Sequence, residues 1–449
     1  MPFPFYERKR ELDVLSKMSE QAAGDCSRML VLTGRRRIGK TTLCNRAFSE
    51  SALKYLFFFI SSEKTEAANL EAFWRDNAGF LGMDGLPVNF ATFAELMEFL
   101  LQRSASTPLV LVIDEFQNCA SVAPSFMSDL QRLWDKWRKR SRMLLVLTGS
   151  VASAMREITE GTNAPLFGRA SAKLILQPFP TDVIKGILTD YHADWRPEEL
   201  LTLYTLAGGV PKYLELLMEA RKFTIEEMIS YAIEPDSFFT TEGDRLLRTE
   251  FRRDYSVYFC ILERIAAGKT KRQELVSAFP SDISGQLFKL EDYFHLIKRE
   301  NPVGRQKNSR NFRFVMADDY LHFWFRFIYP NLGLIQQGST ARLERKILDE
   351  LPDYTGRHVL ERWFRTKLWE SGNFTEVGPW WDASLKGENE IDIVAINPFD
   401  KEVLFGEVKR RKSNIDLDLL KQKSFAFLSQ NPEYRKYDVR CEAYGMEDM

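Results

Sequence analysis

The feature that most constrains this chain is the segment Gly34 to Thr41, which reads G-R-R-R-I-G-K-T. It has the spacing G-x-x-x-x-G-K-[ST] of a phosphate-binding loop, in which glycines let backbone N–H groups surround an anion. An apolar run, Met29 to Thr33, precedes the loop, and a helical stretch, Thr42 to Phe48, follows it. The start of that helix adds its positive dipole end. We therefore expect a nucleotide phosphate site formed by Gly34, Arg35, Arg36, Arg37, Ile38, Gly39, Lys40, Thr41 and Thr42.

Two carboxylates follow another apolar run, Leu109 to Ile113. An unbroken apolar run is typical of a buried parallel strand, and ligands bind at the carboxyl ends of such strands. Asp114 is therefore expected to share Mg²⁺ with Thr41, and Glu115 to orient or deprotonate the attacking water. Lys40 is expected to reach the β- and γ-phosphates. Without the preceding loop, the same two carboxylates would indicate an ordinary strand end.

Further strand candidates alternate with helical stretches. They are Tyr55 to Ile60, Met143 to Leu147 and Ala172 to Leu176. This alternation predicts the α/β class, with a parallel sheet that helices cover on both faces.

Several motifs in order along the chain resemble those of the archaeal-type ATPases, a group close to the AAA+ and STAND nucleotidases. Besides the loop, they are Phe5 to Leu12, Ile113 to Gln117, Leu147 to Ser150, Pro165 to Arg169 and Gly208 to Leu214. The resemblance implies a P-loop NTPase domain over residues 1–235, with a five-stranded parallel sheet of the ASCE type and a helical lid. It also implies ATP and Mg²⁺ as cofactors, and a sensor strand between the strand that precedes the phosphate loop and the strand that runs into Asp114.

The resemblance suggests roles for residues outside the loop. It places Thr148 or Ser150 near the γ-phosphate. Arg169 would stabilise transition-state charge, in one chain or across a homo-oligomer, although a surface arginine explains it equally well. Pro211 would approach the base from the lid, and a helix-opening turn is the alternative.

Residues 250–335 read as three short helices followed by two strands, which is the order of a winged helix. The tip of the strand pair carries Arg305, Lys307 and Arg310, which suit phosphates. The helix expected to serve as the recognition helix also carries Glu291 and Asp292, which would repel a DNA backbone. DNA binding and a protein contact are both open for this module.

Residues 340–449 contain a second set of charged residues on two predicted strands, Asn389 to Ile396 and Val403 to Lys409. Glu407 and Lys409 are two positions apart, so they point to the same face of a sheet. Asp392 and Glu407 suit a divalent metal, and Lys409 would polarise the attacking water or the phosphate. The absence of nearby histidine and cysteine argues against zinc.

This D-x(14)-E-x-K spacing, with V-G-P-W-W at Val377 to Trp381, resembles the PD-(D/E)XK nuclease-like domain that accompanies archaeal-type ATPases. The resemblance implies a restriction-endonuclease-like α/β fold with Asp392, Glu407 and Lys409 as catalytic residues. Ile391 stands where the superfamily has proline. An inert site that keeps these residues is the alternative.

Composition restricts the partners. The net charge is −1, so any contact with DNA requires a local basic patch. The five cysteines form no C-x-x-C pair, which favours reduced thiols in the cytoplasm, and no apolar run is long enough to span a membrane. We therefore expect an ATPase coupled to a DNA-binding, nuclease-like domain in DNA processing, mobile-element biology or defence. The alternative is an ATP-dependent scaffold or transcriptional regulator.

Overall fold

The structure is a computed structural model that describes residues 3–87, 90–161, 164–251, 255–304, 311–382 and 389–449. Packing divides the chain into two compact units. One comprises Tyr6–Gln177, and the other comprises Pro178–Met449 together with the first residues of the chain. The boundary between the two units falls inside residues 1–235, the range predicted for the ATPase domain. The three predicted domain ranges, 1–235, 250–335 and 340–449, therefore stay predictions. Each unit is described by itself.

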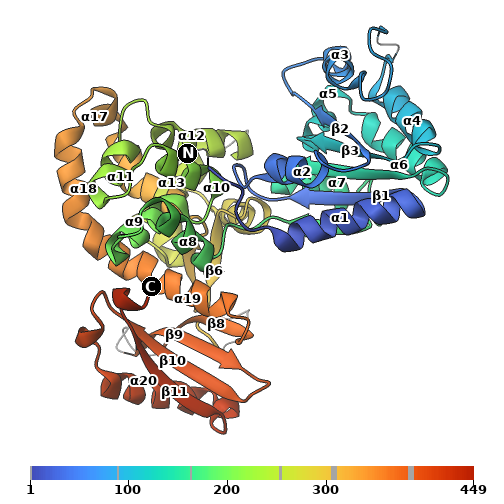
Figure 1. Cartoon of the computed structure of the whole chain (residues 1–449). Helices are drawn as coiled ribbons and strands as arrows, with labels where there is room; N and C mark the ends of the chain where they lie inside the picture. Colours follow the sequence, from blue (N-terminus) through green and yellow to red (C-terminus); the bar gives the residue numbers. More distant parts are fainter. Residues whose placement is uncertain (1–2, 88–89, 162–163, 252–254, 305–310, 383–388) are drawn as a thin grey trace. The chain divides into compact units, whose positions relative to one another are not determined.

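The first unit contains a parallel sheet with strand order β2-β3-β4-β1-β5 (Figure 1). The strands are β1 (Arg28–Thr33), β2 (Lys54–Phe59), β3 (Leu109–Asp114), β4 (Met143–Gly149) and β5 (Ala172–Ile175). This confirms the predicted five-stranded parallel sheet. It also places β4, the predicted sensor strand, between β1 and β3.

Alternating side chains of these strands form two apolar layers, because successive residues of a strand point to opposite faces. Leu30 and Leu32 pack with α1 (Lys9–Gly24) and α2 (Lys40–Phe48) on one face. Met29 and Val31 belong to the layer on the other face. The helices of that layer are α3 (Glu66–Asn77), α4 (Phe93–Ser104), α6 (Phe126–Trp137) and α7 (Ala152–Thr159). The short α5 (Cys119–Val122) follows β3.

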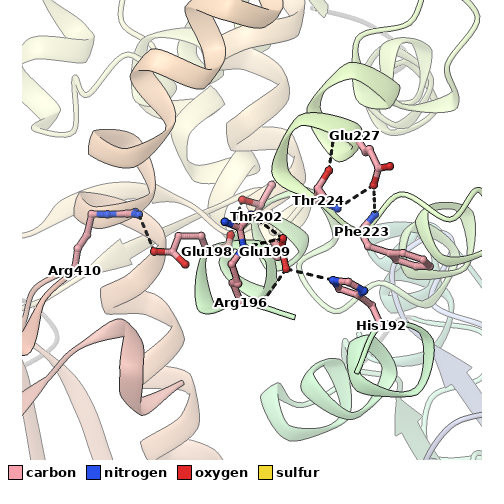
Figure 2. Close-up of polar contacts among 9 residues, drawn as sticks. All are labelled: His192, Arg196, Glu198, Glu199, Thr202, Phe223, Thr224, Glu227 and Arg410. Carbon is pink, nitrogen blue, oxygen red and sulfur yellow. Dashed lines mark hydrogen bonds and ion pairs between the residues drawn. The ribbon is translucent and has the colours of Figure 1, made fainter. Parts of the chain in front are cut away.

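The second unit begins with a group of helices. They are α8 (Thr181–Tyr191), α9 (Pro197–Ala207), α10 (Pro211–Glu219), α11 (Ile225–Ala232) and α12 (Phe238–Phe251). Figure 2 shows how the start of α9 is fixed. The buried carboxylate of Glu199 accepts hydrogen bonds from the backbone N–H of Arg196, at 2.8 Å, and from its guanidinium, at 2.9 Å. The adjacent Glu198 faces Arg410, 4.0 Å away, so α9 contacts the C-terminal part of the chain.

Three helices and an antiparallel strand pair follow, as predicted for this stretch. They are α13 (Tyr255–Ala266), α14 (Arg272–Val276), α15 (Ser284–Phe288), β6 (Ile297–Glu300) and β7 (Arg313–Met316). A π-helical turn, Lys289–Tyr293, extends α15. The predicted basic residues Arg305, Lys307 and Arg310 lie outside the described residues.

The C-terminal part has a four-stranded mixed sheet of order β11-β10-β9-β8 (Figure 1). Its strands are β8 (Glu376–Trp381), β9 (Glu390–Asn397), β10 (Glu402–Val408) and β11 (Asp438–Tyr444). Only β10 and β11 pair in parallel. The helices α16 (Asp319–Phe323), α17 (Leu332–Gln336), α18 (Thr340–Tyr354) and α19 (Leu360–Glu370) precede it, and α20 (Leu417–Gln430) lies between β10 and β11 in sequence. Trp380, Phe405 and Phe427 form the centre of the core between the sheet and α20.

Candidate functional site

The loop between β1 and α2 has the backbone that the glycines of its motif predict. Gly39 caps α2 with a φ of 89°, in the left-handed region that glycine adopts without strain. A Cβ on Gly34 would come within 2.9 Å of the backbone oxygen of Leu176, so a larger residue would not fit there. Ile38 is buried and packs with the apolar layer of α1 and α2, which anchors the loop to the sheet.

The ammonium group of Lys40 is held inside this loop. Its Nζ donates to the backbone oxygens of Gly34, at 2.9 Å, and Arg35, at 3.2 Å. Burial lowers the pKa of Lys40, while the nearby Glu115 and Asp114 carboxylates oppose that shift. The cation is therefore poorly solvated, and anionic oxygens placed at the loop would gain a strong attraction to it.

The carboxylate of Asp114 joins three segments of the first unit. Its Oδ2 accepts from Thr41 Oγ1 at 2.8 Å, which links β3 to the start of α2. Its Oδ1 accepts from the hydroxyl of Thr148 on β4 and from the backbone N–H of Glu115. Adjacent hydroxyl and carboxylate oxygens are hard ligands of the kind that Mg²⁺ prefers, so the residues present fit the expected ion.

The carboxylate of Glu115 is held partly by a residue that directly follows the neighbouring strand β4. Its Oε2 accepts from Ser150 Oγ at 2.8 Å and from the side-chain amide of Gln117. Its backbone has a φ of 53°, an uncommon conformation for a non-glycine residue that often marks a functional position. Ser150 was expected near the γ-phosphate, and its partner in the structure is this carboxylate. The contact of Gln117 was not predicted, although the residue lies within the motif Ile113 to Gln117.

Four other residues expected at this site belong to the loop or follow it directly. Arg35, Arg36 and Arg37 lie within the loop, where the backbone oxygen of Arg35 accepts from Lys40, and Thr42 lies in the first turn of α2. Arg169 forms an ion pair with Asp135 on α6, at 2.7 Å, and also donates to the backbone oxygens of Pro165 and Phe167. These contacts occupy its guanidinium within the first unit, and its role as a finger stays a prediction. Pro211 lies in the second unit at the first position of α10, as in the helix-opening alternative.

The second candidate site lies at the ends of β9 and β10. Asp392 Oδ2 accepts from the backbone N–H of Val408 at 2.8 Å, which fixes this carboxylate beside β10. Burial raises the pKa of Asp392, and the nearby Glu407 carboxylate raises it further. Two carboxylates that repel each other in a partly buried site would be stabilised by a cation.

Two lysines supply positive charge at Glu407. Lys409 Nζ lies 3.1 Å from Oε1, and Lys423 Nζ on α20 donates to Oε2 at 3.2 Å. Burial lowers the pKa of Lys409, but Glu407 and Asp392 outweigh it, so the net shift is upward. Lys409 and Glu407 share one sheet face, as the two-residue spacing predicts, and all three predicted residues line one cavity. Lys423 was not predicted, because neighbours in space from a separate helix have no fixed spacing in sequence.

A third carboxylate, Glu361 on α19, approaches this pair. Its main partner is Arg365, one turn along the same helix, which also donates to the backbone oxygen of Asp392 at 2.8 Å and to Glu300 at 3.0 Å. Burial raises the pKa of Glu361, and Arg365 opposes that shift. Among the described residues, no group of three or more His, Cys, Asp and Glu could hold a metal ion. The donor set that would suit a divalent ion here is therefore the pair Asp392 and Glu407, and both oxygens of Glu407 contact lysines in the structure.

These residues line one side of a cavity of about 590 Å³ inside the second unit. The same cavity is also lined by Lys271, which precedes α14, and by Arg313 on β7. Two other residues of the basic run after β10 have partners within the unit, since Arg410 donates to Thr355 and Lys412 pairs with Asp448. Only Lys409 of that run faces the cavity.

Residues 5–217 match a family described as an ATPase domain predominantly from Archaea. The part of the chain that carries the phosphate loop is therefore similar to these ATPase domains. Residues 324–423 match a second family, described as archaeal and bacterial proteins of unknown function. The ATPase match includes the loop, the Asp114 and Glu115 pair and Arg169, and the second match includes Asp392, Glu407, Lys409 and Lys423.

An uncharacterized protein of Methanocaldococcus jannaschii is 29% identical over 452 residues, which span 96% of this chain and 94% of the relative. Among solved structures, a Walker-type ATPase of Pyrococcus abyssi matches with a TM-score of 0.54 and 16% identity, covering 72% of this chain and 96% of that one. The ORC2 protein of Aeropyrum pernix, in ADPNP and ADP complexes, has a TM-score of 0.48 and 14% identity, covering 76% and 96%. The first of these structures supports the P-loop ATPase fold of this chain. The similarity to the second is too low to support an argument about the fold. Across the described residues, no helix is long and apolar enough to cross a membrane.

Proposed function

We propose that the protein is a Mg²⁺-dependent ATPase whose hydrolysis is carried out by Lys40, Thr41, Asp114 and Glu115. The observation that carries this proposal is the 2.8 Å contact between Thr41 and Asp114, which brings the phosphate loop and the strand end into one site. Bound Mg²⁺ would neutralise charge on the β- and γ-phosphates. Thr41 and Asp114 would hold that ion through their oxygens.

Lys40 and Glu115 have distinct tasks in this mechanism. Lys40 exchanges its bonds to two loop carbonyls for bonds to phosphate oxygens, which neutralises charge that grows in the transition state. Glu115, positioned by Ser150, orients the attacking water and accepts its proton. The predicted contributions of Arg169 and Pro211 are secondary parts of this proposal.

The test is ATP binding and turnover in two variants and a control. Lys40→Ala should lose both binding and turnover, because the phosphates lose their main cation. Glu115→Gln should bind Mg·ATP normally and lose hydrolysis. Lys17→Ala, an exposed lysine on α1, is the matched control and should behave as wild type. Normal turnover in Glu115→Gln would exclude this carboxylate as the water-orienting group.

A second function is favoured by the C-terminal site. We infer that Asp392, Glu407 and Lys409 form a divalent-metal nuclease site, with DNA as substrate and the winged-helix-like module as part of the DNA-binding surface. The order α19, three antiparallel strands, α20 and a parallel β11 supports a restriction-endonuclease-like fold. A bound divalent ion would polarise the phosphate. Lys409 would hold the attacking water beside it.

Calorimetry with Mn²⁺ on the full chain, without nucleotide, tests the metal part of this proposal. Wild type should bind the ion, and Asp392→Asn should lose that binding. Asp438→Asn, an exposed aspartate on β11 of the same sheet, should bind as wild type. Equal binding in all three would favour the scaffold or regulator alternative.

A further inference from the structure

We propose that the cavity containing Asp392 and Glu407 takes an unpaired strand of DNA and excludes a continuous duplex. This rests on the proposed nuclease site, whose substrate class it names. It is carried by three features of the second unit: a cavity wall supplied by the middle module, a group of rings that line the same cavity, and cations that line it beside the carboxylates.

The wall comes from the middle module. The cavity holds about 590 Å³, within the range of pockets that enclose small molecules. Thr270, Lys271 and Arg313 from that module line it together with Asp392 and Glu407. A B-DNA duplex, whose major groove alone is about 12 Å wide, is too large to enter this space. A single nucleotide or a short unpaired strand fits.

Specific contacts hold the wall in place. Arg313 on β7 pairs with Glu390 on β9 at 2.6 Å and lies 4.2 Å from the ring of Trp381. The backbone N–H of Val303 donates to the oxygen of Pro379 on β8 at 2.9 Å. The strand pair β6–β7 is therefore bonded to the same sheet that carries the carboxylates, which holds the middle module beside the cavity.

Three rings line the cavity with the carboxylates. The ring centroids of His322 and Tyr354 are 5.4 Å apart, and His358 lies 5.5 Å from His322 and 5.9 Å from Tyr354. The side chain of His358 is exposed. A base that has left its stack can pack on such a ring, whereas a base inside a duplex has both faces covered.

Cations line the cavity as well. Lys271 and Arg357 are both exposed and face the same space as Lys409. They are placed to contact phosphates on either side of a bound nucleotide, while the base packs on His358. Together these groups match the parts of an unpaired nucleotide: a phosphate at the carboxylates, a base at the rings and a neighbouring phosphate at the cations.

Fluorescence anisotropy on the full chain tests the inference without cleavage. The probes are a short labelled single strand of mixed sequence and the same sequence as a blunt duplex, both in EDTA. The single strand should bind at least about tenfold more tightly. His358→Ala should weaken that binding about tenfold, since a stacked base contributes about 1–3 kcal/mol, and His358→Phe should retain it. Lys271→Glu should also weaken it, whereas Lys436→Glu, an exposed lysine outside the cavity, should not.

Each outcome decides between the proposals. The inference is overturned if the duplex binds as tightly as the single strand or more tightly. It is also overturned if neither His358→Ala nor Lys271→Glu changes the affinity for the single strand. Added Mn²⁺ then tests the chemistry: cleavage of the single strand but not of the duplex supports both proposals. Expected binding with no cleavage of either probe would reject the nuclease role and keep the strand-binding cavity. Faster cleavage of the duplex would reject the cavity inference and keep the nuclease.

Discussion

The phosphate loop and the carboxylate cavity differ in how their parts are supplied. The expected phosphate site lies mostly in one continuous segment, Gly34 to Thr41, in which Lys40 donates to two backbone oxygens of the loop. The cavity collects Glu361, Asp392, Glu407 and Lys423 from α19, β9, β10 and α20. Moreover, its carboxylate Glu407 already contacts two lysines, whereas Asp114 contacts hydroxyls and a backbone N–H. A contiguous site depends on a local motif, and a dispersed one depends on the packing of a whole domain.

The largest expected effect is on ATP turnover, and it distinguishes the Asp114 site from the Asp392 site. Asp114→Ala removes the partner of Thr41 and Thr148, so ATP turnover should fall by about 10³-fold, in the range for losing a group that stabilises the transition state. Asp392→Ala should leave ATP turnover within about twofold, because it belongs to the other unit. Steady-state ATPase assays check both. A large loss in Asp392→Ala would mean that the sites are coupled and would break the comparison.

The second prediction concerns stability at low pH. Burial lowers the pKa of His322 to about 3, and its Nδ1 lies 2.6 Å from the hydroxyl of Tyr354. The folded state therefore holds this imidazole neutral. Its contribution to stability is present above the ordinary histidine pKa of about 6.5 and is lost as the pH falls below it. Between pH 7.5 and pH 5 we expect wild type to lose about 2 kcal/mol more unfolding free energy than His322→Gln.

Denaturant unfolding at the two pH values measures this difference. His295→Gln, which changes an exposed histidine of the same unit, should follow wild type. Parallel curves for wild type and His322→Gln would show that the imidazole does not resist protonation.

The third prediction concerns Glu407, whose carboxylate contacts two lysines. Lys423→Met frees Glu407 Oε2 from its 3.2 Å contact, so Mn²⁺ should bind about tenfold more tightly. Calorimetry measures the change. Lys421→Met removes an exposed lysine of the same helix and should leave the affinity unchanged. Weaker binding in Lys423→Met would instead mean that this lysine positions Glu407 for the ion.

The smallest expected effect lies in the first unit. Ser150→Ala removes one hydrogen bond to Glu115 and leaves the contact with Gln117, so turnover should fall about three- to fivefold. ATP affinity should not change, because Ser150 touches the carboxylate rather than the loop. A kcat measurement at saturating Mg·ATP is the check, and a loss as large as that of Glu115→Gln would make Ser150 the dominant support of that carboxylate.

The sequence predicted the first unit well because its rules are local. Apolar runs such as Leu109 to Ile113 become buried parallel strands, and the carboxylates that follow them meet at one sheet edge. The contacts of Gln117 and Lys423 could not be predicted in this way, since each depends on a side-chain direction or a helix position fixed only by packing. The ion pair between Arg169 and Asp135 also lay beyond sequence reasoning, because it joins residues of two separate segments.

The helices α8 to α10 illustrate how these modules are joined. Nearly all of their residues fall within the ATPase family match, yet they pack with the C-terminal part: Thr181 bonds Glu370, the ring of Tyr204 contacts Trp363, and that of Tyr213 contacts Tyr320. A gene fragment that ended at residue 217 would encode these helices without their partners and expose buried aromatic surface. Recombination is therefore constrained. A different C-terminal domain can be inherited with this ATPase only if it brings matching surfaces for α8 to α10, or if the exchange occurs near residue 178.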